Sequence, residues 1–356
     1  MDPGIDPAGG KPLMAENNKK LNEIGLSRSD YKGKPSTLCL GCGHNAIVGQ
    51  IIAACHELNI PPESLIKISG IGCSSKAPTY FMERSFGFNG LHGRMPSLAT
   101  GALFGDTTLL GIGVSGDGDT ASIGMGQFKH VTRRNLPLLY IVANNGVYGL
   151  TKGQFSATAE EGLALKKQGQ NRYVPVDIVW EAIAGRASFV ARSFSGDPQQ
   201  LKSLIKAGLH HKGIAVIDVI SPCVTFNNQD ESFHSYAWGK SHEVALHELS
   251  FVPPVRAIKV QYAKGETLEV PMYDGTHIIL KKLAQDYEPT NRAKALQMLE
   301  EANDRNELIT GLIYINPKQK SLFDLYDLPE TPLNRLSADR LRPSRESLDE
   351  INQLMY

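Results

Sequence analysis

The sequence predicts an α/β protein built on an open, mostly parallel sheet with helices on both faces. Three largely apolar segments, at 109–115, 138–143 and 213–220, have the composition of strands buried on both faces of such a sheet. Segments with helical spacing of apolar residues alternate with them. Residues 109–143 hold a strand, a helix and a second strand in succession, which predicts a βαβ unit with a right-handed crossover.

The remaining elements follow in chain order. Residues 1–35 are expected to form a flexible arm. The helix at 45–58 presents one apolar stripe and is stopped by Pro61 and Pro62. Further elements are predicted as follows: strands at 65–69 and 187–194; helices at 97–104, 122–134, 177–184 and 198–211; and a polar, glycine-dotted mobile loop at 151–172.

The chain becomes more charged after Pro253 and Pro254. We therefore divide it into an arm at 1–35, a main domain at 36–252 and a C-terminal extension at 253–356. The extension is expected to contain an amphipathic helix at 292–308 and then a proline-dotted tail that wraps a surface.

Composition excludes several classes of protein. The 356 residues include 37 Lys and Arg against 37 Asp and Glu, so no basic face for nucleic acid is expected. The sequence contains no run of about 18 apolar residues, so it predicts no membrane-spanning helix. The polar N-terminus lacks an apolar signal core, which favours a cytoplasmic protein. Five cysteines, an odd number, indicate metal or redox chemistry rather than a disulfide scaffold.

The most informative motif spans the βαβ unit. Gly116, Asp117 and Gly118 follow its first strand, and Asn144 and Asn145 follow its second, 28 residues after Asp117. Adjacent parallel strands would bring these side chains to one sheet edge, where α/β proteins bind ligands. The Asp117 carboxylate, the Asn145 amide oxygen and the Val147 carbonyl suit Mg²⁺ shared with a diphosphate. The alternative is that both motifs are ordinary turns.

Four cysteines form a second set of candidate ligands. Cys39 and Cys42 make a CxxC in a glycine-rich turn, and Cys73 and Cys223 each follow a predicted strand. Four thiolates suit a [4Fe–4S] cluster or a zinc ion, and an unrelated dithiol with two buried cysteines is the other alternative. Cys55 lies on the apolar stripe of the first helix, so we expect it in the core.

These motifs resemble those of known families. GDG, a gap of this length and NN are the signature of thiamine-diphosphate enzymes, in which the residues matching Asp117, Asn145 and Val147 bind Mg²⁺. The wider set resembles the β subunits of 2-oxoacid:ferredoxin oxidoreductases over about residues 35–250. It comprises CLGCG at 39–43, GIGCSSK at 70–76, LHGRMPSLATG at 91–101, GDGD at 116–119, NNGVYGLTKGQ at 144–154 and SPC at 221–223. Leu40 departs from many members, which have a Trp-Cys-Pro or Cys-Pro context there.

The resemblance implies a thiamine-diphosphate-binding fold and a specific reaction. A 2-oxoacid, coenzyme A and oxidised ferredoxin would give acyl-CoA, CO₂ and reduced ferredoxin, with electrons passing from the thiamine through the cluster. The glutamate that activates the cofactor belongs to a second domain, which this chain does not show. An α subunit is therefore implied, in an αβ or α₂β₂ complex.

Several polar residues are weaker candidates. His92 could face the diphosphate or reacting centre, Lys76 could bind a substrate carboxylate, and Lys152 could bind a substrate or CoA anion. Arg94 and Asp119 are assigned to cofactor binding. For each, a structural loop residue or solvated side chain is the alternative. His210 and His211 are expected to face solvent.

The motif set looks more like that of the 2-oxoglutarate enzymes than that of the pyruvate enzymes. Lys76 offers a cation for the distal carboxylate of 2-oxoglutarate. Pyruvate or a branched-chain 2-oxoacid is the alternative substrate. A cluster-free thiamine-diphosphate decarboxylase with structural zinc is the alternative enzyme.

Overall fold

The fold is organised around one eight-stranded sheet. The computed structural model describes residues 20–166, 168–252, 267–271, 277–282, 287–329 and 331–355. The strand order is β11-β15-β9-β10-β4-β3-β1-β2. The bounds are β1 (Leu65–Ser69), β2 (Phe86–Asn89), β3 (Leu110–Gly116), β4 (Leu138–Asn144), β9 (Phe189–Phe194), β10 (Ile214–Ile220), β11 (Glu243–Ala245) and β15 (Leu308–Ile315).

Neighbouring strands from β2 to β9 all pair in parallel, whereas β15 pairs antiparallel with β9. β3 and β4 are in register from Ile112↔Leu139 to Gly116↔Ala143, so they end side by side. The predicted parallel α/β sheet is confirmed. Its carboxyl edge carries the loops after β1, β3, β4 and β10.

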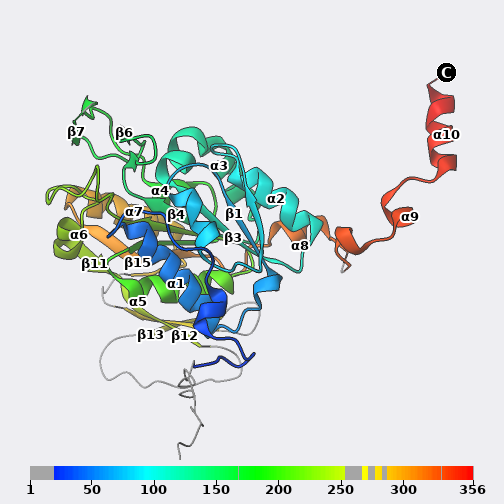
Figure 1. Cartoon of the computed structure of the whole chain (residues 1–356), viewed down its shortest axis with the longest axis horizontal. Coiled ribbons are helices and arrows are strands. Elements are labelled where there is room, and N and C mark those ends of the chain that lie inside the picture. The colour runs from blue at the N-terminus through cyan, green and yellow to red at the C-terminus, as the bar shows by residue number, and fades with distance from the viewer. Residues whose placement is uncertain are drawn as a thin grey trace, which may run out of the picture.

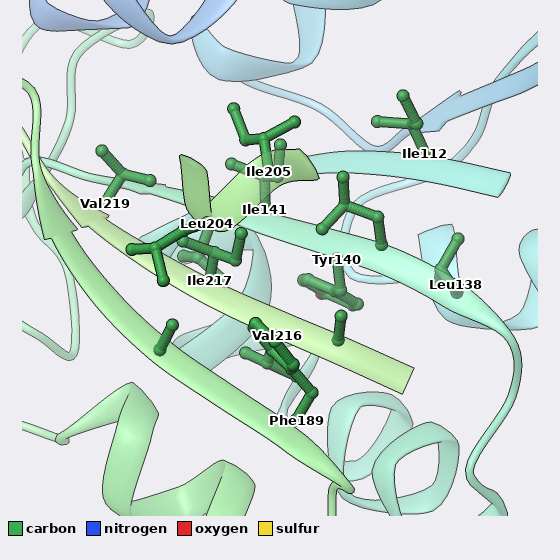
Figure 2. Close-up of a cluster of buried hydrophobic side chains, with 14 of the residues drawn as sticks. Ile112, Leu138, Tyr140, Ile141, Phe189, Leu204, Ile205, Val216, Ile217 and Val219 are labelled. Carbon is green, nitrogen blue, oxygen red and sulfur yellow. The ribbon is translucent and has the colours of Figure 1, made fainter. Parts of the chain in front are cut away.

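Helices cover both faces of the sheet. On one face α1 (Gly43–Glu57) packs against α5 (Pro198–Leu209). The other face carries α2 (Met95–Gly105), α3 (Met125–Arg134), α4 (Ile178–Ala184) and α7 (Arg292–Asp304) (Figure 1). Figure 2 shows how β3, β4, β9 and β10 send apolar side chains toward Leu204 and Ile205 of α5 to build the core. This buried apolar layer keeps the strand ends in place.

Smaller elements complete the chain. The short helices are η1 (Arg28–Tyr31), η2 (Pro62–Ser64), η3 (Ser74–Tyr80), a π-helical turn η4 (Gly118–Ile123), α6 (Tyr236–His242), α8 (Leu322–Tyr326), η5 (Leu333–Arg335), α9 (Ala338–Leu341) and α10 (Arg345–Leu354). Two short hairpins pair β5 (Val147–Tyr148) with β6 (Gln154–Phe155) and β7 (Ala164–Leu165) with β8 (Gly169–Gln170). A separate antiparallel sheet has the order β12 (His247–Val252), β14 (His277–Lys282) and β13 (Thr267–Pro271).

The ends of the chain differ in part from expectation. Residues 1–19 of the predicted arm lie outside the described residues. From Lys20 onward the chain packs on α1, and Tyr31 is fully buried. The helix predicted at 292–308 ends at Asp304, because Leu308 already begins β15. β15 is buried along its whole length inside the main sheet, which the charged composition of residues 255–356 did not suggest.

The C-terminal tail packs on the body of the chain only in its first part, where α8 contacts Phe104 and η5 contacts Asp106. α9 and α10 have no buried residues, and Figure 1 shows them projecting away from the sheet. No helix among the described residues is long and apolar enough to span a membrane. The prediction that His210 and His211 face solvent is wrong for His211. That ring is buried and its Nε2 lies 2.5 Å from Ser188 Oγ, because α5 ends against β9.

Candidate functional site

The central pair of the site comes from two neighbouring strand ends. Asp117 follows β3 directly and is the residue before η4, while Asn145 follows β4. The Asn145 N–H lies 3.4 Å from Asp117 Oδ1. Parallel pairing of β3 and β4 thus brings together residues 28 apart, as the motif spacing predicted.

Asp117 is buried among polar groups. Its side chain is 2% exposed, and Oδ2 accepts a hydrogen bond from Thr158 Oγ1 at 2.8 Å. Burial raises the pKa of this carboxyl, although hydrogen bonds from Ser156 and Thr158 and the charge of His234 act in the opposite direction. A carboxylate in such a setting is stabilised by any cation that reaches it.

Asn145 is also fixed by its surroundings. Its Oδ1 accepts from the Val147 N–H at 3.1 Å, and its Nδ2 lies 3.4 Å from His44 Nε2. His44, in the first turn of α1, is buried, and burial lowers its pKa to about 4. The imidazole is therefore neutral at physiological pH. Asn145 and Val147 share a narrow turn that points toward Asp117.

A small cavity of about 40 Å³ opens at this edge. It is lined by the catalytic candidate His92 and by every predicted cofactor residue except Arg94, namely Gly116, Asp117, Gly118, Asp119, Asn145 and Val147. A Cβ on Gly118 would lie 2.5 Å from the Tyr148 ring, whose hydroxyl donates to the Gly118 carbonyl at 2.9 Å. Glycine is required at this position because the ring packs directly on the backbone.

Asp119 joins the loops around the cavity. It is 2% exposed, accepts from the Gly93 N–H at 2.7 Å and from Ser115 Oγ at 2.7 Å, and contacts His92 Nδ1. A Cβ on Gly70 would lie 2.0 Å from its Oδ2, so the loop after β1 also packs on it. These contacts give Asp119 a bracing role and orient His92 at the cavity. Contact of either residue with a diphosphate stays a prediction.

Four cysteines gather beside the cavity, as the sequence predicted. Cys39, Cys42, Cys73 and Cys223 line a neighbouring cavity of about 200 Å³. A Cβ on Gly149 would lie 3.6 Å from Cys73 Sγ and 3.5 Å from Cys223 Sγ. Within the described ranges, no three His, Cys, Asp or Glu side chains are placed to hold a single metal ion.

The fifth cysteine lies elsewhere. Cys55 is fully buried in α1, within the main apolar core, as its stripe position predicted. Burial raises the pKa of its thiol to about 12, so it carries no charge at neutral pH.

The cationic candidates are less closely associated with the site. Lys76 lines the cysteine cavity together with Leu150 and Phe226. Arg94 precedes α2 and is exposed, and Lys152 is exposed in the β5–β6 turn with a positive φ of 76°. Neither Arg94 nor Lys152 lines either cavity. Their predicted roles stay untested.

Sequence reasoning missed a set of polar residues beneath the strand ends. Thr158 and Glu160 come from the segment predicted as a loop, and Asn227 and His234 come from the loop after β10. Asp218 and Arg192 form a buried pair on β10 and β9, and Asp218 Oδ1 accepts from Asn144 Nδ2 at 3.1 Å. The signal available was a charged residue inside each of two apolar strands, which requires a buried partner.

Comparisons with known proteins agree with the thiamine-diphosphate-type fold described above. Residues 70–219 match the family model described as thiamine pyrophosphate enzyme, C-terminal TPP binding domain. The chain is 41% identical over 191 residues to the 2-oxoacid:ferredoxin oxidoreductase subunit beta of Saccharolobus solfataricus, covering 53% of this chain and 63% of that protein. It is 40% identical over 196 residues to the 2-oxoglutarate synthase subunit KorB of Methanocaldococcus jannaschii, covering 54% of this chain and 71% of that protein.

A solved structure extends the similarity to nearly the whole chain. It is a 2-oxoglutarate:ferredoxin oxidoreductase from Magnetococcus marinus with 2-oxoglutarate, coenzyme A and succinyl-CoA bound. The TM-score is 0.72 at 25% identity, with 95% of this chain and 98% of that chain covered. In sequence, by contrast, the match to the Saccharolobus protein spans less than two thirds of that protein's length, 63%.

Proposed function

Because the chain belongs to the family of 2-oxoacid:ferredoxin oxidoreductase β subunits, we propose that it catalyses the oxidative decarboxylation of a 2-oxoacid together with an α subunit. The products would be acyl-CoA, CO₂ and reduced ferredoxin. One observation carries the proposal: Asp117 and Asn145 meet at the sheet edge with four cysteines gathered beside them.

The residues at the sheet edge fit Mg²⁺ and thiamine diphosphate. Asp117 is a buried carboxyl group, and its burial raises its pKa because the charged form loses its hydration. A bound cation would stabilise that charged form. The Asp117 carboxylate, Asn145 Oδ1 and the Val147 carbonyl would be the protein ligands, all of them oxygens as Mg²⁺ prefers. Free N–H groups of η4 beside Gly118 would bind the diphosphate.

The cysteine cavity supports a [4Fe–4S] cluster. A cluster of four irons needs its four thiolates around a space of its own size, whereas zinc needs them within about 2.3 Å of one point. All four cysteines, Cys39, Cys42, Cys73 and Cys223, line one open cavity of about 200 Å³. This openness favours the cluster over the zinc alternative.

Each residue then has a defined task. Thiamine diphosphate, when bound, supplies the nucleophilic carbon and the electron sink for decarboxylation. Asp117, Asn145 and Val147 hold the cation, and His92, oriented by Asp119, faces the cavity from its rim. Lys76 would pair with a carboxylate of the substrate, and Lys152 and Arg94 would bind anionic groups of substrate or cofactor.

The partners follow from the chemistry and the family. The α subunit would supply the glutamate that activates the cofactor, and ferredoxin would accept the electrons. An α₂β₂ complex in the cytoplasm is the proposed assembly. The free thiols at the site are consistent with a reducing compartment.

The proposed substrate is 2-oxoglutarate, which would give succinyl-CoA. The Methanocaldococcus relative is named 2-oxoglutarate synthase, and the Magnetococcus structure contains 2-oxoglutarate and succinyl-CoA. Pyruvate and branched-chain 2-oxoacids are the alternative substrates.

The test is a substrate panel with the complex co-purified under anaerobic conditions. Reduction of a viologen dye is followed with each 2-oxoacid in the presence and absence of CoA. We expect CoA-dependent turnover with a preference for 2-oxoglutarate, about four irons per β chain and broad absorbance near 400 nm, which is typical of [4Fe–4S] clusters. A colourless, zinc-containing complex without CoA-dependent turnover would contradict the proposal.

A Lys76 variant then tests the substrate preference. Lys76→Gln should raise KM for 2-oxoglutarate more than KM for pyruvate, because only 2-oxoglutarate has a second carboxylate. Equal effects on both substrates would remove Lys76 from the specificity argument.

A further inference from the structure

A close contact between a buried histidine and a partly buried glutamate lies next to the proposed cation site. His234 has a side chain that is 1% exposed, and its Nδ1 lies 3.0 Å from Glu160 Oε2. Its Nε2 lies 3.1 Å from Asn144 Oδ1. Both ring nitrogens therefore lie within hydrogen-bond distance of a side-chain oxygen. Burial raises the pKa of Glu160, but the hydrogen bond and charge of His234 outweigh it and lower that pKa to about 2.

The contacts continue from this pair to Asp117. Thr158 Oγ1 lies 2.8 Å from Asp117 Oδ2 and 2.9 Å from Asn144 Oδ1. A hydroxyl has one hydrogen, and a carboxylate is the stronger acceptor, so Thr158 donates to Asp117. Asn144 Oδ1 then depends on His234 for its hydrogen bond, while Asn144 Nδ2 is held by Asp218 at 3.1 Å.

The backbone around His234 also shows that the ring is closely fitted. Gly146 has a φ of 73°, and a Cβ there would lie 2.9 Å from His234 Cε1. Asn227, from the same loop as His234, donates to the Asn145 carbonyl at 3.0 Å. The loop after β10 therefore supports the Asn144–Asn145–Gly146 turn from below at two points.

We propose that Glu160 and His234 form a positioning pair that fixes the side chain of Asn144. The pair would thereby set the orientation of the neighbouring Asn145, whose N–H contacts Asp117, toward the divalent cation. The inference rests on the proposed Mg²⁺–thiamine diphosphate site and assigns no contact of either residue with substrate or cofactor. Residues that hydrogen-bond directly to the ligands of a metal affect its affinity by about 10–100-fold when removed. His234 and Glu160 act one contact further out, through Asn144, so a smaller effect is expected.

The test uses the intact complex with its partner subunit. His234→Gln and Glu160→Gln keep side-chain size and remove the ion pair, and Glu160→Asp keeps the charge. His242→Gln is the matched control, because its ring stacks on Trp238 and its Nδ1 contacts only Ser241 and the Trp238 carbonyl within α6. The measurements are the Kd of Mn²⁺ by electron paramagnetic resonance in the presence of thiamine diphosphate, the iron content and the melting temperature.

We expect Mn²⁺ affinity to fall by up to about 10-fold in His234→Gln and Glu160→Gln, the lower end of the range for residues bonded directly to metal ligands, with iron content unchanged. The double variant should lose no more affinity than the weaker-binding single variant, because the two residues act as a unit. Glu160→Asp should recover part of the affinity, and His242→Gln should match the wild type. Recovery of Mn²⁺ affinity in Glu160→Asp would show that the carboxylate positions His234. A general loss of packing would lower the affinity in this variant as well.

Two results would overturn the inference in different ways. If the wild-type complex binds Mn²⁺ with thiamine diphosphate and the variants bind it equally well, even with lowered melting temperatures, the pair is merely structural and only this inference fails. If the wild-type complex binds no Mn²⁺ with thiamine diphosphate, the proposed function fails together with it.

Discussion

The backbone N–H of Asn145 lies 3.4 Å from Oδ1 of Asp117, so the end of β4 is tied to the end of β3 through the proposed cation ligand. This contact depends on the parallel pairing of the two strands, which aligns Gly116 with Ala143. The 28-residue spacing of Asp117 and Asn145 in the sequence and the register of β3 with β4 in the sheet therefore both indicate that these two residues share one site.

Asp117→Asn should abolish binding of Mg²⁺ and thiamine diphosphate while leaving the cysteine cavity intact. The substitution preserves shape and removes the negative charge that the cation needs. The loss of affinity should exceed the roughly 10–100-fold typical of residues behind the metal ligands. Bound thiamine diphosphate and iron are measured in the purified complex. Asp304→Asn, at an exposed position, is the control, and activity surviving in Asp117→Asn would refute the site assignment.

Two cysteine substitutions separate the proposed ligands from the core. Cys223→Ala should lose most of the iron, because one of the four thiols around the cavity is removed. Cys55→Ala should keep the iron and cost about 1 kcal/mol of unfolding free energy, because it deletes one buried atom from α1. Iron analysis and chemical denaturation measure the two effects. Full iron content in Cys223→Ala would exclude it as a ligand.

The sequence predicted the site better than it predicted the edges of the fold. Asp117, Asn145 and the four cysteines are brought together because each follows a strand whose apolar run is easy to recognise. β15 was missed because it pairs with β9, which lies more than 100 residues earlier in the chain. The local composition around β15 does not indicate that pairing. Thr158, Glu160 and His234 were missed for a similar reason, since their partners lie on other segments.

The exposed tail gives a prediction about stability. Ending the chain after Leu336 removes α9 and α10, which have no buried residues, so the unfolding free energy should change by less than about 0.5 kcal/mol. Asp106 would keep its contacts with Asn334 and Arg335. Thermal and chemical unfolding measure the effect.

A longer truncation is the control for this experiment. Ending the chain after Gln319 also removes Leu322, which is 3% exposed and whose N–H donates to the Asn135 carbonyl. Loss of that buried leucine should cost about 2–5 kcal/mol. If the shorter truncation destabilises the chain as much as the longer one, α9 and α10 pack on the body in solution and the projecting arrangement is wrong.

His211 gives a prediction about pH. Burial at the end of α5 lowers its pKa from 6.5 to about 3, so the folded protein keeps the ring neutral. The unfolded chain takes up a proton below pH 6.5, which the folded chain does not. This group's contribution to stability is therefore complete above pH 6.5 and is lost as the pH falls, by up to about 1.4 kcal/mol per pH unit.

The variant His211→Gln isolates this effect. Glutamine does not titrate, so the unfolding free energy of the wild type relative to the variant should be constant from pH 7 to 8 and should decrease between pH 6.5 and 5. Groups that titrate in both proteins, such as Asp218, whose pKa burial raises to about 6 although Arg192 opposes the shift, cancel in this difference. Urea denaturation at each pH measures it. A difference that stays constant down to pH 5 would show that the ring takes up its proton in the folded state, and hence that water reaches it beside Ser188.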